Sequence, residues 1–132
     1  VDALHLADRE LMTLSGGEKQ RILLAKALAQ VSVEDVSVGN KKFLLLDEPT
    51  ASLDLKQAQT VMRILRAAAD SGIGIVLVIH DIASARRYGD VVFLLKDGGL
   101  AYAGEPKSVL TAEKIADSFD VDSETAEDSL GI

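Results

Sequence analysis

Apolar positions along the chain follow two spacings, which predict that helices and strands alternate. Helical spacing, with capping residues and glycines at the ends, predicts helices over about 16–30, 55–70, 81–88 and 106–119. Short uninterrupted apolar runs predict strands buried on both faces at 43–46 and 75–79, and a hairpin formed by 91–95 and 100–103 around Asp97-Gly98-Gly99. This order predicts an α/β domain: a mostly parallel sheet flanked by helices, followed by a hairpin and a helix.

Two segments show neither the helical spacing of apolar residues nor the apolar runs of a strand. Residues 31–42 are polar and contain glycine and asparagine, so we expect a surface loop there. Residues 123–132 are acidic and rich in small side chains, which predicts a mobile tail. We therefore expect one domain over residues 1–122 and an acidic mobile tail over 123–132.

Composition narrows the classes of function. Among 132 residues, 14 Lys and Arg stand against 21 Asp and Glu, for a net charge of -7, and no basic cluster is evident. Such a chain repels phosphate backbones, so we expect no nucleic-acid partner. Cysteine is absent, which excludes disulfides and thiolate metal sites within this sequence and is compatible with a reducing compartment. No apolar run approaches the ~20 residues that a membrane span needs.

The first candidate for chemistry is the string Leu14-Ser15-Gly16-Gly17-Glu18-Lys19-Gln20-Arg21. Ser15 and Glu18 have the spacing of a capping box, which by itself indicates only the start of a helix. Two consecutive glycines disfavour a helix, and one explanation is that backbone amides must approach an anion closely. A helix start with bare N–H groups and a serine hydroxyl suits a terminal phosphate.

The second candidates are polar residues that directly follow the two predicted buried strands. Asp47 and Glu48 follow 43–46, and His80 follows 75–79. An acidic strand end and a histidine bonded by backbone are both common, so these residues alone leave the ordinary structural alternative open. His5 has no such setting, so we expect it to be an ordinary histidine bonded by the backbone.

The three groups together resemble the motifs of ABC ATPases, in that family's order. Residues 14–21 resemble the signature motif, 43–54 resemble the Walker B strand, catalytic glutamate and D-loop (Thr50 to Asp54), and His80 resembles the switch histidine that contacts the γ-phosphate. The resemblance implies ATP and Mg²⁺ as ligands, Glu48 and His80 as catalytic residues, and Asp47 in the magnesium shell. It implies these nucleotide-binding residues: Leu14, Ser15, Gly16, Gly17, Glu18, Ser52 and Asp54.

One motif of the family is missing from the sequence. No G-x-x-x-x-G-K-S/T string occurs, and the only glycines at that spacing, Gly99 and Gly104, precede Glu105. Nothing in the chain is therefore expected to cradle the α and β phosphates. The resemblance covers about residues 1–122 but only the carboxyl-terminal half of the family's domain, a partial P-loop NTPase-like fold. Because the chain begins at Val1 rather than Met, we expect further sequence upstream.

The family also implies partners and a place in the cell. ABC ATPases pair head to tail, with each nucleotide between the Walker A loop of one subunit and the signature helix of the other. Residues 80–90 and 104–111, together with the insertion at 31–42, are similar to ATPases of importers for iron and cobalt chelates. This similarity implies a peripheral subunit docked on membrane permease subunits at the cytoplasmic face. The expected cargo is heme first, then cobalamin, then siderophores.

Two alternatives remain from the sequence. A soluble ABC ATPase of DNA repair or chromosome maintenance has the same motifs, but there a heptad coiled coil precedes them, and neither heptads nor a basic face is present here. The second alternative is that the chain is a non-catalytic fragment, inactive without its Walker A half. Whichever interpretation holds, we expect the isolated 132-residue chain to be inactive.

Overall fold

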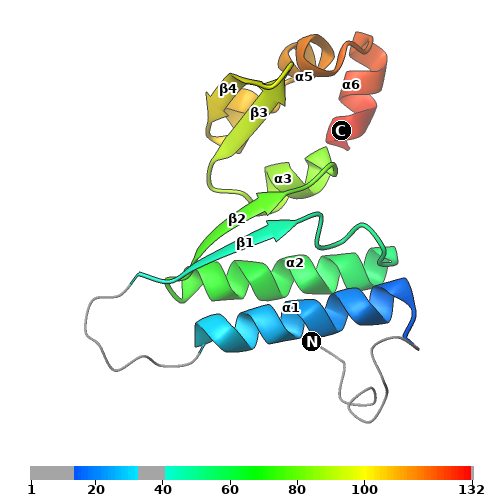
Figure 1. Ribbon diagram of the computed structural model, residues 1–132. Helices are drawn as coiled ribbons and strands as arrows, with labels where there is room; N and C mark the ends of the chain where they lie inside the picture. The colour runs from blue at the N-terminus through cyan, green and yellow to red at the C-terminus, as the bar shows by residue number, and fades with distance from the viewer. Residues whose placement is uncertain (1–13, 33–40, 132) are drawn as a thin grey trace. The chain divides into compact units, whose positions relative to one another are not determined.

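The computed structural model describes residues 14–32 and 41–131. The chain forms two compact units, Val1–Ile79 and His80–Ile132. From α1 to β3, helices and strands alternate as the sequence predicts (Figure 1). Most of the predicted loop at 31–42, and His5, lie outside the described residues.

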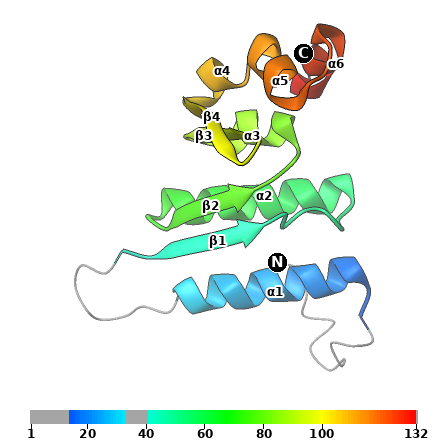
Figure 2. The ribbon, with the colours of Figure 1, turned by 45° about the horizontal axis from the view of Figure 1, so that its top comes forward.

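The first unit is built from two helices and two strands. Its elements in chain order are α1 (Gly16–Ser32), β1 (Phe43–Asp47), α2 (Leu55–Asp70) and β2 (Gly74–Val78). The strands are parallel, with Leu44 opposite Ile75 and Asp47 opposite Val78 (Figure 2). Figure 1 shows α1 and α2 on the same side of this sheet. The carboxyl ends of both strands consequently lie at one edge of the unit.

The two faces of sheet β1–β2 are very different. Leu44, on the helix-covered face, is 6% exposed and packs in a core that includes Val61, Met62 and Leu65 of α2. The opposite face is apolar and uncovered: its side chains are 54% to 74% exposed, and they are Phe43, Leu45, Val76 and Val78. The prediction that these strands are buried on both faces is therefore wrong for this chain, because the described helices cover only one.

The second unit combines a hairpin with four helices. Its elements are α3 (Ile82–Tyr88), β3 (Val92–Lys96), β4 (Gly99–Gly104), α4 (Pro106–Val109), α5 (Ala112–Phe119) and α6 (Ser123–Leu130). The predicted hairpin is confirmed: β3 and β4 are antiparallel, and the turn residues Asp97 and Gly98 have φ values of 50° and 76°. The core of the unit consists of Leu94, Val109, Leu110, Ile115, Ala126 and Leu130.

Polar contacts fasten α5 to the hairpin. The Lys96 ammonium donates to the Asp120 carboxylate at 3.2 Å, and the Tyr102 hydroxyl donates to the Asp117 carboxylate at 3.1 Å. The hydrogen bond that Lys96 donates to Asp120 is the main cause that raises the pKa of Lys96, and the bond that Tyr102 donates to Asp117 raises the pKa of Tyr102. These contacts fix the end of α5, where Asp120 takes a left-handed conformation.

The single helix predicted over 106–119 is wrong, because the chain leaves the helical conformation in its middle. Leu110 has φ −88° and ψ 70°, and Thr111 is extended. The Thr111 hydroxyl then accepts a hydrogen bond from the Lys114 amide at 3.4 Å and so caps α5. A helix-capping residue within an apolar pattern thus divides the segment into α4 and α5.

The tail predicted over 123–132 is not irregular where the structure describes it. Residues Ser123–Leu130 form α6, in which Ala126 is 0% and Leu130 is 5% exposed. A spacing of four residues puts these two side chains on one face of the helix, against the core of the second unit. None of the helices in the described ranges combines the length and apolar character that a membrane span needs.

The cap of α6 yields a testable prediction. The Asp122 carboxylate accepts a hydrogen bond from the Thr125 amide at 2.7 Å, and this bond lowers the pKa of Asp122. A lowered pKa means that the stabilisation is present above the ordinary value of 3.8 and is lost as the pH falls through the lower, folded-state value. We expect Asp122→Ala at pH 7 to lower the protection of the α6 amides against hydrogen exchange, relative to the intrinsic exchange rate at that pH, because the cap is lost.

The matched control is Asp128→Ala, because Asp128 is an exposed carboxylate of the same helix whose side chain caps nothing. Equal exchange rates in the two variants would show that the cap does not hold α6.

Candidate functional site

The predicted capping box opens α1. The Ser15 amide donates to the Glu18 carboxylate at 2.8 Å, and the Glu18 amide donates to the Ser15 hydroxyl at 3.3 Å. Ser15 and Gly16 are exposed, so the helix start faces solvent. Amides in the first turn of a helix have no acceptor within the helix, which leaves them suited to an anion.

Leu14 anchors this helix start. Its side chain is only 5% exposed and belongs to the core of the first unit. The nucleotide contact that the resemblance implies for Leu14 therefore has to come from its backbone, and it stays a prediction.

Gly17 lies against the D-loop of the same chain. A Cβ atom added to Gly17 would be 3.0 Å from the Ser52 carbonyl oxygen and 3.5 Å from Leu53 Cδ2. One added to Gly16 would be no closer than 3.9 Å to Ser52. The sequence predicts that both glycines serve an anion, whereas the structure gives Gly17 a second reason: α1 and the D-loop approach too closely for a side chain.

The two adjacent carboxylates differ in backbone conformation. Asp47 is the last residue of β1 and is exposed, whereas Glu48 lies beyond the strand with φ 45°. The Glu48 amide donates to the Val78 carbonyl at 2.8 Å, and the Glu48 carbonyl accepts from the Ala51 amide at 3.2 Å. The strand alternation expected to separate the two side chains does not reach Glu48, so the left-handed turn sets its direction instead.

Gln20 links α1 to both Glu48 and the D-loop. Its side-chain NH₂ group donates to the Glu48 carbonyl at 2.7 Å, and its side-chain oxygen accepts from the Ser52 amide at 3.2 Å. Sequence reasoning did not select Gln20 as a site residue. The local pattern carries no sign of these bonds, because their partners are 28 and 32 positions away.

Asp54 has a structural task in addition to any contact with nucleotide. Its carboxylate accepts from the Gln57 amide at 2.8 Å and caps α2. This cap fixes where the D-loop ends and the helix begins. Ser52, by contrast, is exposed at its side chain and is held through its backbone.

The first unit thus brings together most of the residues predicted for the site. The helix start at Ser15 to Glu18, the carboxylates Asp47 and Glu48, and the D-loop all belong to it. His80 is exposed, follows the end of β2 by two residues and is the first residue of the second unit. Its role as a switch histidine stays a prediction.

The carboxylates of the candidate site could bind magnesium only together with phosphate oxygens. Among the described residues, no group of three or more His, Asp or Glu side chains is arranged to hold a metal ion. Magnesium keeps several waters and needs only one or two carboxylates plus phosphate oxygens. Asp47, exposed at the carboxyl end of β1, fits the part of a single protein ligand.

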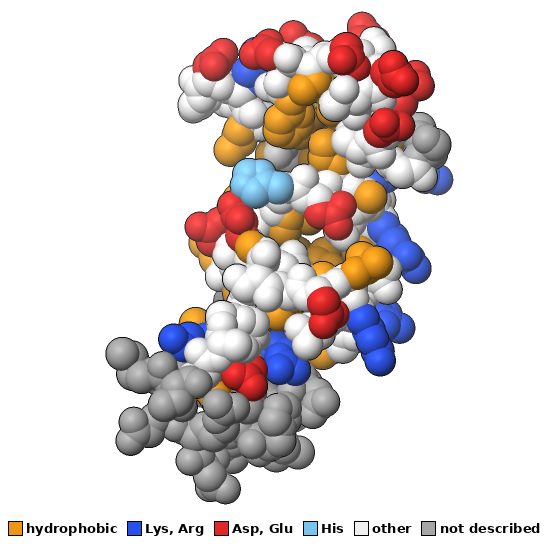
Figure 3. Space-filling model, turned by 90° about the vertical axis from the view of Figure 1, so that its right-hand side faces the viewer, with side chains coloured by type: hydrophobic (Ala, Val, Ile, Leu, Met, Phe, Trp, Pro, Cys, Tyr) orange, Lys and Arg blue, Asp and Glu red, His pale blue; other side chains and the backbone are white. Residues whose placement is uncertain are grey.

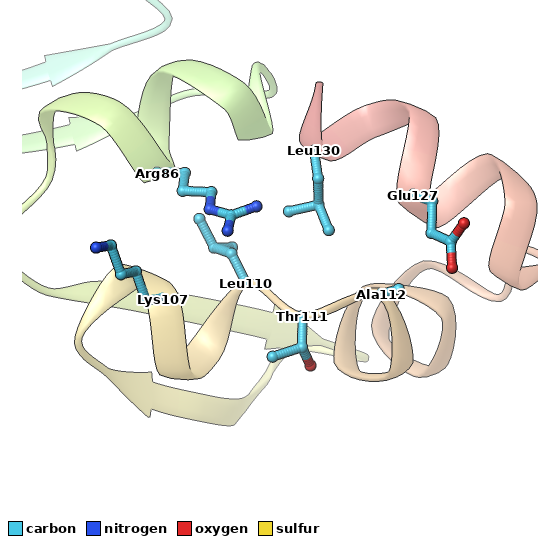
Figure 4. Close-up of a pocket in the computed structure, with 7 residues that line it drawn as sticks. All are labelled: Arg86, Lys107, Leu110, Thr111, Ala112, Glu127 and Leu130. Atoms are coloured by element: carbon cyan, nitrogen blue, oxygen red, sulfur yellow. The ribbon is translucent and has the colours of Figure 1, made fainter. Parts of the chain in front are cut away.

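A separate pocket of about 390 Å³ lies in the second unit. Figure 4 shows Arg86 reaching from α3 toward Leu110 and Leu130, with the Glu127 carboxylate directed away from Arg86. None of the predicted site residues lines it.

In the view of Figure 3, acidic side chains gather over the part of the second unit that carries α5 and α6. This negative charge does not favour a nucleic-acid partner there.

The contact between Gly17 and the D-loop yields a prediction that needs no activity. Replacing an early helical glycine by alanine usually stabilises a helix by up to about 1 kcal/mol. We expect Gly16→Ala to raise the unfolding midpoint, because nothing obstructs its Cβ. Gly17→Ala should instead lower the midpoint or speed amide exchange at Ser52 and Leu53, since its Cβ meets the Ser52 carbonyl. Equal effects of the two substitutions would contradict the close approach.

Comparison with known sequences gives relatives over most of the chain. No protein-family profile matches it. It is 39% identical over 123 residues to the hemin import ATP-binding protein HmuV of Hahella chejuensis, covering 93% of this chain and 47% of the relative. It is 47% identical over 115 residues to HmuV of Gloeobacter violaceus, covering 87% and 41%. The chain thus spans about half the length of these relatives.

Solved structures agree with the sequence relatives. A metal-chelate type ABC transporter in an inward-facing conformation is similar with a TM-score of 0.72 and 32% identity, over 88% of this chain and 43% of the other. A dimeric ATP-binding cassette in a post-hydrolysis state bound to ADP and Pi is similar with a TM-score of 0.66 and 33% identity, over 78% and 40%. Motifs, sequence matches and fold together show that this chain is similar to ABC ATPases, in which it matches a carboxyl-terminal part of the nucleotide-binding domain.

Proposed function

We propose that this chain is the signature-bearing part of the ATP-hydrolysing subunit of an ABC importer for an iron or cobalt chelate, with heme as the first candidate. The observation that carries the proposal is that the Ser15 helix start, the carboxylates Asp47 and Glu48, and the D-loop are grouped in one unit. The Ser15 helix start lies against the D-loop through Gly17, and Gln20 binds the backbone of Glu48.

The exposed start of α1 suits the terminal phosphate of a nucleotide. It offers the hydroxyl of Ser15 and the amides of the first turn, and the positive end of the helix dipole favours negative charge. The sequence holds no loop for the α and β phosphates, so the nucleotide must be gripped by another segment. ATP then bridges two subunits in a head-to-tail dimer, and hydrolysis removes the bridge.

During ATP hydrolysis, residues of this chain would position the attacking water and stabilise the charge on the phosphate. Phosphoryl transfer depends mainly on the placement of the nucleophile and on stabilisation of the phosphate charge. The Glu48 carboxylate orients the attacking water and accepts its proton. Asp47, together with phosphate oxygens, would hold Mg²⁺, which neutralises phosphate charge when bound. His80 would contact the γ-phosphate.

The names of the relatives support the proposed cargo. The curated relatives are named for hemin import, and a structural relative is described as a metal-chelate type transporter. We further propose, from the resemblance to the family, that the ATPase lies at the cytoplasmic face of the membrane, bound to permease subunits and paired with a second ATPase subunit. Nothing in the described residues favours the alternative of a DNA-acting ATPase, and the net charge of -7 opposes it.

The role of Glu48 is tested in the complete ATPase that contains this chain. Glu48→Gln keeps the size of the side chain and removes the base, so we expect ATP binding and dimer formation with turnover reduced by roughly 10²-fold or more. Phosphate release and size-exclusion chromatography with ATP measure the two effects. The matched control is Asp70→Asn, at the far end of α2 in the same unit, which should leave turnover unchanged. Undiminished hydrolysis by Glu48→Gln would remove Glu48 as the base.

The incomplete nucleotide site makes a second prediction. The isolated 132-residue chain should release phosphate from ATP no faster than the same chain carrying Glu48→Gln, because it has no loop for the α and β phosphates. A malachite-green phosphate assay on both preparations measures the difference. Hydrolysis by the isolated chain that depends on Glu48 would overturn the requirement for a partner loop.

A further inference from the structure

Gln20 has both ends of its side-chain amide engaged by main-chain atoms of the site. The NH₂ group donates to the Glu48 carbonyl at 2.7 Å, and the amide oxygen accepts from the Ser52 amide at 3.2 Å. The bond to Glu48 is partly buried, which shields it from competing water. One side chain of α1 therefore fixes two points, the residue that follows the Walker B strand and the D-loop.

The backbone of Glu48 needs such support. A residue other than glycine at φ 45° is in the left-handed region, which costs of the order of 1 kcal/mol and persists only where neighbours hold it. The Val78 carbonyl holds the Glu48 amide from β2, and the Ala51 amide holds the Glu48 carbonyl from within the turn. Gln20 adds a link from α1, so the direction of the Glu48 carboxylate depends on where α1 lies.

Gln20 also shares a helix face with the residue that contacts the D-loop most closely. Gly17 and Gln20 are three positions apart and therefore neighbours on the surface of α1. Gly17 packs on the Ser52 carbonyl, and Gln20 accepts from the Ser52 amide. The first turn of α1 and the D-loop are thus joined on both sides of Ser52, and a displacement of one is expected to displace the other.

We propose that Gln20 is a positioning residue that couples engagement of the α1 start by a terminal phosphate to the placement of Glu48 and the D-loop. This inference rests on the proposed function. In a head-to-tail dimer, α1 of one subunit faces the nucleotide gripped by its partner, while Glu48 acts on the nucleotide gripped by its own subunit. Gln20 therefore joins the two nucleotide sites of the dimer through a single side chain.

Substitutions of Gln20 separate this role from general stability. Gln20→Met keeps the length and approximate shape of the side chain but removes both hydrogen bonds. Gln20→Glu keeps an acceptor for the Ser52 amide and replaces the donor to the Glu48 carbonyl by a carboxylate oxygen. Gln30→Met is the matched control, because Gln30 is exposed in the last turns of the same helix.

The complete ATPase carrying each variant is assayed for steady-state ATP hydrolysis. We expect kcat to fall by roughly 10- to 100-fold in Gln20→Met and Gln20→Glu, since a small misplacement of a catalytic group has effects of this size. The KM for ATP should change by no more than about twofold, because the groups that bind ATP are intact. The Hill coefficient for ATP should decline toward 1, and Gln30→Met should match the unmodified enzyme.

Two further measurements complete the test. In the Glu48→Gln background, ATP-driven dimerisation should survive Gln20→Met. Amide exchange at Ser52 should accelerate in Gln20→Met and stay slow in Gln20→Glu, which still offers an acceptor.

The outcomes distinguish this inference from the function on which it rests. Unchanged kcat and Hill coefficient in both Gln20 variants, with Glu48→Gln inactive, would overturn the coupling role and leave the proposed function standing. A parallel loss of ATP binding and of thermal stability would assign Gln20 to the structure alone and also overturn it. Full turnover in Glu48→Gln would instead remove the proposed function itself.

Discussion

The close contact between the first turn of α1 and the D-loop is the constraint on which the site depends. Gly17 permits it, because a Cβ atom there would lie 3.0 Å from the Ser52 carbonyl oxygen. The contact places an exposed helix start, which suits phosphate, beside the residues that follow the Walker B strand. Gln20 then binds the Glu48 carbonyl and the Ser52 amide, so that α1, the backbone of Glu48 and the D-loop form one hydrogen-bonded assembly.

Local patterns were enough to predict most of the elements and the capping box that opens α1. The Ser15 and Glu18 capping box is present as expected, and α2 begins and ends where its apolar spacing and Gly72 indicate. The failures lie where the outcome depends on distant contacts. Helix α6 forms because Ala126 and Leu130 are buried in a core that its acidic sequence does not reveal. Gln20 and the packing role of Gly17 likewise depend on partners about thirty positions or more away, and no spacing within the string 14–21 indicates them.

The uncovered face of sheet β1–β2 and the missing phosphate-binding loop point to the same need. Phe43, Leu45, Val76 and Val78 form an apolar face that water solvates poorly, although strands of a parallel sheet are normally covered on both sides. The sequence that binds the α and β phosphates is also absent from this chain. Both observations agree with its length, about half that of its curated relatives. In the proposed function, the segment that supplies the loop would also cover this face, and a second subunit would complete the nucleotide site at α1.

The most direct test of the central claim is amide hydrogen exchange at Gly16, Gly17 and Ser52 in the complete ATPase, measured without nucleotide, with ADP and with ATP. The Glu48→Gln variant prevents turnover during the measurement. If the α1 start receives a terminal phosphate and is tied to the D-loop, exchange at all three amides slows with ATP and stays near the nucleotide-free rate with ADP. Identical exchange in the three conditions would contradict the claim that α1 binds the phosphate.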